Sequence, residues 1–209
     1  MSFTILDKEK WARKEHFEFF SKFDEPFYGV VVTIDVTGAY HFAKENNKSF
    51  FVVYLHRILK ALNSVENLRY RIRENEVVVH DKIGASATIA RENETFGFSN
   101  IEFSEDFDAF NVLACAEIDR VKNNTGLEIG VSGDDVIHFS ALPWVDFTSI
   151  SHARSFAFPD SCPKISVGKL KNENGKLTMP MSVHVHHALA DALHVGRFIE
   201  QLEKELRAV

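Results

Sequence analysis

Along the chain, segments whose apolar and polar residues follow a strand pattern alternate with segments whose apolar residues recur at helical spacing. Strands are predicted where β-branched residues gather, or where apolar and polar residues alternate between turn signals. These patterns predict strands over Gly29–Val36, Ala85–Ala90, Thr95–Ile101, Asp135–Ser140 and Trp144–Ile150, and a hairpin over Tyr70–Asp81 that turns near Glu74-Asn75. A second hairpin is expected from Lys164–Leu170 and Lys176–His186, because the intervening Asn174-Gly175 tolerates positive φ.

Three segments are expected to be helical. Ser49–Asn63 is apolar nearly all round, which favours a helix buried on several sides. Asp106–Lys122 has apolar residues at helical spacing, and Asp191–Leu206 places its apolar residues on one stripe. Mixed helices and antiparallel hairpins predict a two-layer α/β or α+β sandwich. With no linker, repeat or low-complexity segment, residues 1–209 are interpreted as a single domain.

Composition narrows the class of protein. The net charge is −6, so we expect no nucleic-acid partner, because binding to phosphates depends on clustered cations. No membrane partner is expected either, since no run approaches the roughly 20 apolar residues of a span. The N-terminus lacks a signal-peptide pattern, and Cys115 and Cys162 lie outside any CxxC motif, which favours the cytoplasm. The 19 phenylalanines indicate either a Phe-rich core or an aromatic-lined pocket, and composition favours the core.

The segment HVHHALAD, from His184 to Asp191, carries the richest chemistry. Three histidines in four positions suggest a metal site. A strand of period two, however, points His184 and His186 to one face and His187 to the other, where Val183 and Val185 lie. Three ligands would then not converge on one ion, so no metal is expected.

His187 is the candidate base of this segment. It lies between a strand and a helix, where a ring can reach the mouth of a cleft, and Asp191 follows four residues later. A neutral imidazole can accept a hydroxyl proton near neutral pH, and burial among apolar residues would help to keep it neutral. The alternative is a core histidine whose hydrogen bonds are satisfied.

His186–Phe198 (HHALADALHVGRF) resembles the HHxxxDG signature of the chloramphenicol acetyltransferase family, one of the CoA-dependent acyltransferases. Four further blocks resemble segments of that family in the expected order. They are Trp11–Phe17 (WxRxxHF), Phe139–Phe147 (FVSANPWVSF), Ser166–Lys169 (TMGK) and Lys176–Pro180, the lead-in to the histidine strand. The expected fold is therefore an α/β (α+β) two-layer sandwich like that of the CoA-dependent acyltransferases. Its sheet should be mixed and largely antiparallel, with helices packed on one face.

The resemblance implies direct acetyl transfer from acetyl-CoA to a substrate hydroxyl, with no acyl-enzyme and no metal. His187 would be the general base, Ser140 would donate to the oxyanion, and Ser166, in place of the family threonine, would support the same oxyanion. Asp191 would pair with Arg13 and fix the loop that carries the base. It would therefore not orient the His187 ring as a triad member.

The resemblance also implies the binding partners. Trp144 and Tyr28 are candidate walls of the acetyl-CoA site, and Lys169 is a candidate contact for the nucleotide phosphates or else a solvated lysine. Family members are homotrimers with active sites between subunits. The apolar strand face with Val183 and Val185 is compatible with such an interface and equally with an internal core.

Two departures lie close to the expected chemistry. Ala192 replaces a family glycine, so the turn there should be helical or slightly altered, and Leu142 replaces an asparagine. Phe27, Phe96 and Phe98 could line a chloramphenicol-sized pocket. The leading hypothesis is chloramphenicol O-acetylation. The alternatives are acyl transfer to another small alcohol, and a catalytically silent trimeric binding protein.

Overall fold

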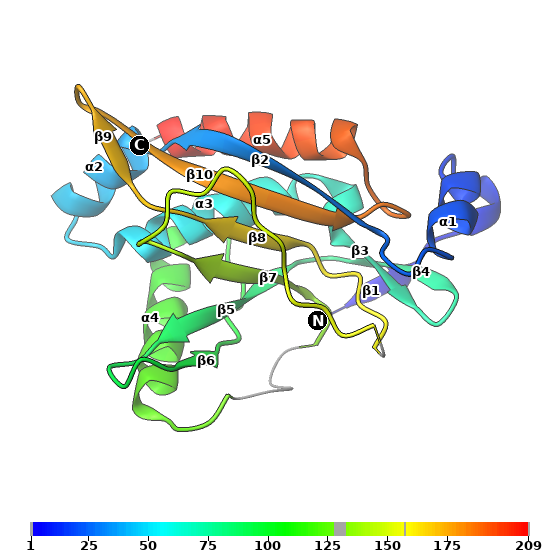
Figure 1. Cartoon of the computed structure of the whole chain (residues 1–209), viewed down its shortest axis with the longest axis horizontal. Helices are drawn as coiled ribbons and strands as arrows, with labels where there is room; N and C mark the ends of the chain where they lie inside the picture. The colour runs from blue at the N-terminus through cyan, green and yellow to red at the C-terminus, as the bar shows by residue number, and fades with distance from the viewer. Residues whose placement is uncertain (1, 128–132, 157, 209) are drawn as a thin grey trace.

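The computed structural model describes residues 2–127, 133–156 and 158–208. A seven-stranded sheet has the order β2-β10-β8-β7-β5-β6, with β9 pairing beside β10 (Figure 1). Its parallel pairs are β5 with β7 and β7 with β8, and its other pairs are antiparallel. The strands are β2 (Phe27–Asp35), β5 (Gly84–Ala90), β6 (Phe96–Phe98), β7 (Val136–Ala141), β8 (Lys164–Val167), β9 (Lys171–Glu173) and β10 (Lys176–His186).

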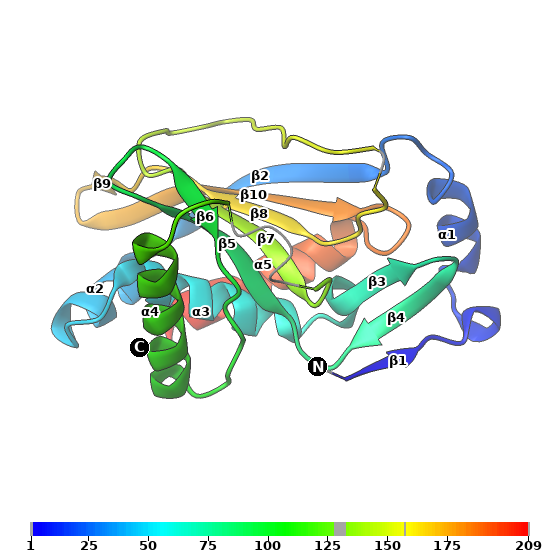
Figure 2. The same cartoon turned by 90° about the horizontal axis from the view of Figure 1, so that it is seen from below.

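Helices cover one face of this sheet (Figure 2). They are α2 (Thr37–Glu45), α3 (Phe50–Asn63), α4 (Phe107–Asn123) and α5 (Ala192–Arg207). Alternate strand residues such as Phe139, Ile165 and Val183 join the helices in one buried core, and the residues between them point to the opposite face, called here the open face. The predicted two-layer fold with a mixed sheet is confirmed. No helix among the described residues is long and apolar enough to cross a bilayer.

A smaller sheet stands beside the end of β10. It has the order β1 (Phe3–Ile5), β4 (Glu76–His80), β3 (Tyr70–Arg73), with the short helices η1 (Lys8–Lys10) and η2 (Glu66–Arg69) nearby. α1 (Lys14–Phe20) packs against it through Phe17, which shares a small core with Tyr70, Val77, Ala188 and Leu189. This core joins the N-terminal region to the turn that follows β10.

The predicted strand over Trp144–Ile150 is wrong. After Pro143 the chain turns, with the Val145 N–H donating to the Leu142 carbonyl at 3.0 Å, and residues 142–156 then cross the open face without strand pairing (Figure 2). The β-branched and aromatic residues of this segment misled the prediction, because they cover a sheet instead of extending one.

The strand predicted over Lys164–Leu170 ends early, at Val167. A side chain at Gly168 would meet Pro180 Cγ and the Val145 carbonyl, both at 2.6 Å, so three chain segments converge there. The predicted Asn174-Gly175 turn is present, with φ values of 54° and 87°, but it joins β9 to β10. β1, α1 and α2 were not predicted, because none has a long apolar period.

Candidate active site

His187 lies in the turn of residues 186–190 that follows β10, called here the His187 turn. The turn is closed by the Leu189 and Ala190 N–H groups, which donate to the His186 carbonyl at 2.9 and 3.1 Å. The His187 N–H donates to Pro26 at 2.8 Å, which ties the turn to the start of β2. The imidazole stacks on Phe20 and Tyr28, with ring centroids 4.0 and 5.1 Å away. Two aromatic rings therefore fix the plane of a half-buried imidazole.

One hydrogen bond fixes the tautomer of this ring. His187 Nδ1 lies 3.3 Å from the Ala190 carbonyl oxygen, which can only accept, so Nδ1 carries the proton in the neutral ring. Nε2 then carries a lone pair and is free to accept a proton. That is the state a general base requires.

Arg13 and Asp191 are brought together beside the His187 turn. The Arg13 Nη1 donates to Asp191 Oδ2, and its Nη2 donates to the His187 carbonyl at 3.1 Å. The same carboxylate is the N-cap of α5, accepting from the Leu193 N–H at 3.0 Å, with His194 Nδ1 2.8 Å away. One guanidinium thus anchors both the start of α5 and the main chain of the candidate base.

The charge on Asp191 is maintained by these contacts. Burial acts to raise the pKa of Asp191, but the bond from Arg13 and the nearby charges outweigh it, so this pKa lies below its ordinary value of 3.8. Ala192 follows as the first residue of α5 and adopts helical geometry. The family glycine is therefore not needed for a positive φ here.

Ser140 and Ser166 lie side by side on the open face. They are directly paired across the parallel strands β7 and β8, and Thr88 Oγ1 donates to Ser140 Oγ at 3.4 Å. Both serines line a cleft of about 590 Å³, called here the serine cleft, whose other walls include Leu142, Trp144, His152 and Phe96. A hydroxyl donor in an open cleft is suited to stabilising a developing oxyanion.

Two of the three predicted coenzyme residues share this end of the sheet. Trp144 lines the serine cleft and is 76% exposed. The Lys169 N–H donates to the Val145 carbonyl at 2.8 Å, so Lys169 lies beside the Trp144 turn, and its side chain is exposed. Tyr28 does not join them. It pairs with Val185 near the end of β10 and stacks on His187, and burial and then the Asp191 charge raise the pKa of its phenol.

His187 and Ser140 lie at opposite ends of the sheet within one chain. β10 runs antiparallel to β8, so its carboxyl end points away from the carboxyl ends of β7 and β8 (Figure 1). Ser166 is opposite Ser182, and His187 lies five residues beyond Ser182. At about 3.3 Å per residue this is roughly 16 Å along the strand. One chain therefore does not bring the candidate base to the candidate oxyanion donor.

Comparison with known proteins decides the family. The sequence model described as "Chloramphenicol acetyltransferase" matches residues 1–203. This chain belongs to the chloramphenicol acetyltransferase family. It is 32% identical to "Chloramphenicol acetyltransferase 3" of Escherichia coli over 206 residues, 98% of this chain and 97% of that relative. A Bacillus pumilus chloramphenicol acetyltransferase is 28% identical over 93% of this chain and 89% of its own length.

Solved structures agree with the family. A chloramphenicol acetyltransferase superposes with a TM-score of 0.90 at 31% identity, over 98% of this chain and 100% of that one. A dihydrolipoamide acetyltransferase of Azotobacter vinelandii superposes with a TM-score of 0.68 at 12% identity, over 88% and 82% of the two chains, which shows the shared fold alone. As a member of the chloramphenicol acetyltransferase family, the chain is an acyltransferase enzyme.

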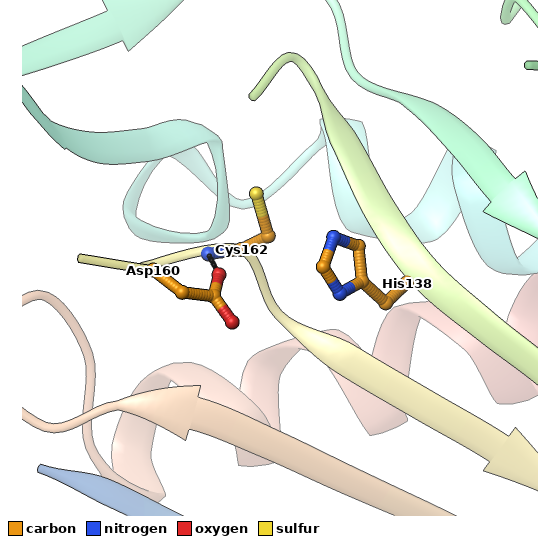
Figure 3. A group of neighbouring side chains, drawn as sticks. All are labelled: His138, Asp160 and Cys162. Carbon is orange, nitrogen blue, oxygen red and sulfur yellow. Dashed lines mark hydrogen bonds between the residues drawn. The ribbon is translucent and has the colours of Figure 1, made fainter. Parts of the chain in front are cut away.

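A group of possible metal ligands lies on β7 and on the segment just before β8. His138, Asp160 and Cys162 place their ligand atoms within 4.8 Å of one another (Figure 3). Lys164 Nζ, however, donates to Asp160 Oδ2 and lies 3.2 Å from His138 Nδ1. Burial raises the pKa of the Cys162 thiol, and burial with the Lys164 charge lowers the pKa of His138 to about 4. The lysine already neutralises the carboxylate, so this group is interpreted as a partly buried ion pair.

The structure also tests the expectations for the Val183 and Val185 strand face and for the phenylalanines. Val183 and Val185 belong to the internal core, so their strand face is not an interface. Phe96 lines the serine cleft, and the Phe98 ring packs edge-on against the Phe96 ring. Phe27 lies with His186 near the other end of the sheet, so the three phenylalanines do not form one pocket. Phe20, which stacks on the base, was missed. Its place three residues after Phe17, on the same side of a short helix, was the available signal.

Proposed function

We propose that this enzyme transfers the acetyl group of acetyl-CoA to a hydroxyl of chloramphenicol. The observation that carries the proposal is the imidazole of His187, which stacks on two aromatic rings and has its Nδ1 3.3 Å from the Ala190 carbonyl oxygen. This contact leaves Nε2 for the substrate proton. The relatives named chloramphenicol acetyltransferase support the choice of acceptor.

In the proposed reaction, His187 Nε2 takes the proton of the substrate hydroxyl while its oxygen attacks the acetyl carbonyl carbon. The carbonyl oxygen becomes an oxyanion that Ser140 stabilises by donating a hydrogen bond, with support from Ser166. Collapse of the tetrahedral adduct breaks the carbon–sulfur bond, and the imidazolium returns its proton to the thiolate. The products are the O-acetyl ester and free coenzyme A, with no acyl-enzyme and no change in the base.

The position of the two halves of the site supports a homotrimer with active sites between subunits. The serine cleft of one chain would meet the His187 turn of its neighbour, since the two lie at opposite ends of each sheet. Apolar side chains are exposed near the His187 end, which suits burial against a second copy; they are Phe19, Phe23, Phe156 and Phe158.

The coenzyme would lie at the carboxyl ends of β7 and β8. Trp144 offers an exposed indole for the pantetheine arm, and Lys169, which forms no ion pair with any described residue, offers a cation for the phosphates. Tyr28 would contribute a wall only across the subunit interface, because it accompanies His187. Both cysteines are free, which supports a cytoplasmic location.

Another small alcohol is the second candidate acceptor. Leu142 lies on the wall of the serine cleft, where the family motif has an asparagine, so a more apolar acceptor than chloramphenicol would suit this wall.

The test is thiol release from acetyl-CoA with chloramphenicol and with a panel of other alcohols. The proposal expects release with chloramphenicol and a loss of about 10²–10⁴-fold in kcat for His187→Ala. The matched control is His41→Ala, an exposed histidine on α2, which should retain activity. Thiol release with another alcohol but not with chloramphenicol would show that this other alcohol is the acceptor. Silence across the panel, with coenzyme still bound, would favour a binding protein and overturn the proposal.

A further inference from the structure

A cluster of unpaired polar atoms lies behind the serine cleft. Ser166 Oγ, Ser182 Oγ, His152 Nε2 and His184 Nδ1 are all buried and have no hydrogen-bond partner among the described residues. Native proteins pair nearly all such atoms, with protein groups or with ordered water. Four of them close together therefore indicate a ligand-binding corner.

The sheet register places these atoms in one corner. Ser182 on β10 is directly opposite Ser166 on β8, and both side chains point to the open face, because Met181, Val183 and Ile165 point into the helix-covered core. Both serines are 0% exposed. Side chains that face each other in an antiparallel pair have Cβ atoms about 4.5–5.5 Å apart. The two hydroxyls bond neither each other nor another described residue, so a group that bridges them would satisfy both.

Two histidine rings, those of His184 and His152, lie next to the two serines and form another wall of the corner. His184 follows Ser182 by two residues on the same strand face, and its ring lies over Gly29, where any side chain would collide with it. The His152 ring packs edge-on against His184 with centroids 4.7 Å apart. His152 and Ser166 also line the serine cleft, so the corner adjoins that cleft.

The chemistry of the corner matches water. Burial lowers the pKa of His152 to about 4 and also lowers the pKa of His184, so both rings are neutral near pH 7. Each hydroxyl can donate and accept, and each unpaired ring nitrogen does one or the other. None of these groups carries a charge, and Lys164, whose charge acts on both rings, is paired with Asp160. A small neutral molecule that also donates and accepts satisfies them best.

We propose that ordered water fills this corner and joins Ser182 to Ser166, which makes Ser182 a positioning residue for the oxyanion site. The Ser182 hydroxyl would donate to the water, and the water would donate to Ser166 Oγ. The Ser166 hydroxyl proton would then be free to point into the serine cleft, toward the developing oxyanion. This role rests on the proposed acetyl transfer, but the water itself does not.

Kinetics test the positioning role. Ser182→Ala is expected to lower kcat by roughly tenfold, less than loss of a direct oxyanion donor, and to leave KM for both substrates unchanged. In the Ser166→Ala background, Ser182→Ala should have little further effect, because both act through one hydroxyl. An unchanged kcat in Ser182→Ala, or full additivity of the two changes, would overturn the positioning role.

Stability tests the water without any need for turnover. If the corner were dry, Ser182→Ala would remove an unsatisfied hydroxyl and raise the melting temperature; if water bridges it, the melting temperature falls by about 2–4 °C. Ser99→Ala is the matched control, since Ser99 is equally buried and its hydroxyl donates to the Ala87 carbonyl at 3.0 Å. Its melting temperature should fall while its kcat stays at the wild-type value.

A high-resolution crystal structure of the wild-type protein decides the identity of the bridge. Water density within hydrogen-bonding distance of Ser166 and Ser182 supports the proposal, and a direct bond between the two hydroxyls overturns it. If the wild-type protein transfers acetyl to no alcohol, the proposed function fails, while the melting temperatures and the density still report on the water.

Discussion

The kcat of acetyl transfer should depend strongly on a single group, the Ser140 hydroxyl. It faces the serine cleft from β7, beside Thr88 and Ser166. Ser140→Ala removes a donor aimed at charge that exists only in the transition state, so kcat should fall by about 10²–10³ with little change in KM. Steady-state thiol release measures both. Ser151→Ala, an exposed serine of the segment crossing the open face, should behave as the wild type. A kcat loss below threefold for Ser140→Ala would remove this serine from the mechanism.

The Arg13–Asp191 pair should behave as one unit. Its side chains are 11% and 31% exposed, so Arg13→Met or Asp191→Asn alone should cost about 1–3 kcal/mol of unfolding free energy, less than a fully buried pair. The double variant should cost less than the sum, because neither partner is then left unpaired. Urea unfolding provides these values. Lys204 and Glu200, exposed at 63% and 72%, form the control pair and should add independently.

At the scale of elements, Asp191 links the start of α5 to the pH dependence of stability. Arg13 and His194 hold its pKa below the ordinary 3.8, so the ionised carboxylate stabilises the folded state above about pH 4. This contribution is lost as the pH falls through the lower, folded-state pKa. The stability difference between wild type and Asp191→Asn should therefore be constant near neutral pH and shrink below pH 4.

Urea unfolding at a series of pH values measures this difference. Asp119→Asn, at an exposed position on α4, should follow the wild type throughout. A wild-type advantage that persists unchanged into strong acid would show that the carboxylate charge does not stabilise α5.

Elements with a clear local period were predictable, and elements defined by their neighbours were not. The apolar periods of α3 and α5 gave helices within a residue or so of those observed. α1 is only seven residues long and is held by contacts to the smaller sheet, which no local pattern reveals. The segment after Pro143 has strand-like composition, yet it covers a sheet, because a turn at Leu142–Val145 redirects it.

The same distinction holds for the site. The types and spacing of His187 and Asp191 suggested a base near a helix start, and family resemblance added Arg13 and Ser140. The spacing of Phe17 and Phe20 placed both on one side of a short helix, but the stacking of Phe20 on His187 depends on how α1 docks against the His187 turn. The hydrogen bond to Ala190 depends on the shape of that turn, which the sequence pattern did not give. The place of Tyr28 was also missed, since it follows from the register of β2 against β10.

At the scale of the whole molecule, strand direction determines what one chain can do. β7 and β8 end at the serine cleft, whereas β10 ends at the His187 turn, so each chain carries half of the proposed site at each end of its sheet. Closed cyclic assembly would join the His187 turn of each copy to the serine cleft of the next. A homotrimer would then hold three equivalent sites, and an isolated chain would hold none.

This arrangement makes complementation between two inactive variants possible. Chains with His187→Ala retain Ser140, and chains with Ser140→Ala retain His187. In randomly mixed assemblies, about one quarter of the sites would combine an intact base from one chain with an intact serine from its neighbour. Co-purification through two different tags keeps only the trimers that contain both variants. Each of these has one intact site out of three, so the purified pair should recover about a third of wild-type kcat. The control joins His187→Ala to the double variant His187→Ala/Ser140→Ala, in which no site has a base. If the mixed pair stays as inactive as this control, base and serine act within one chain, and the strand directions would no longer require a second copy.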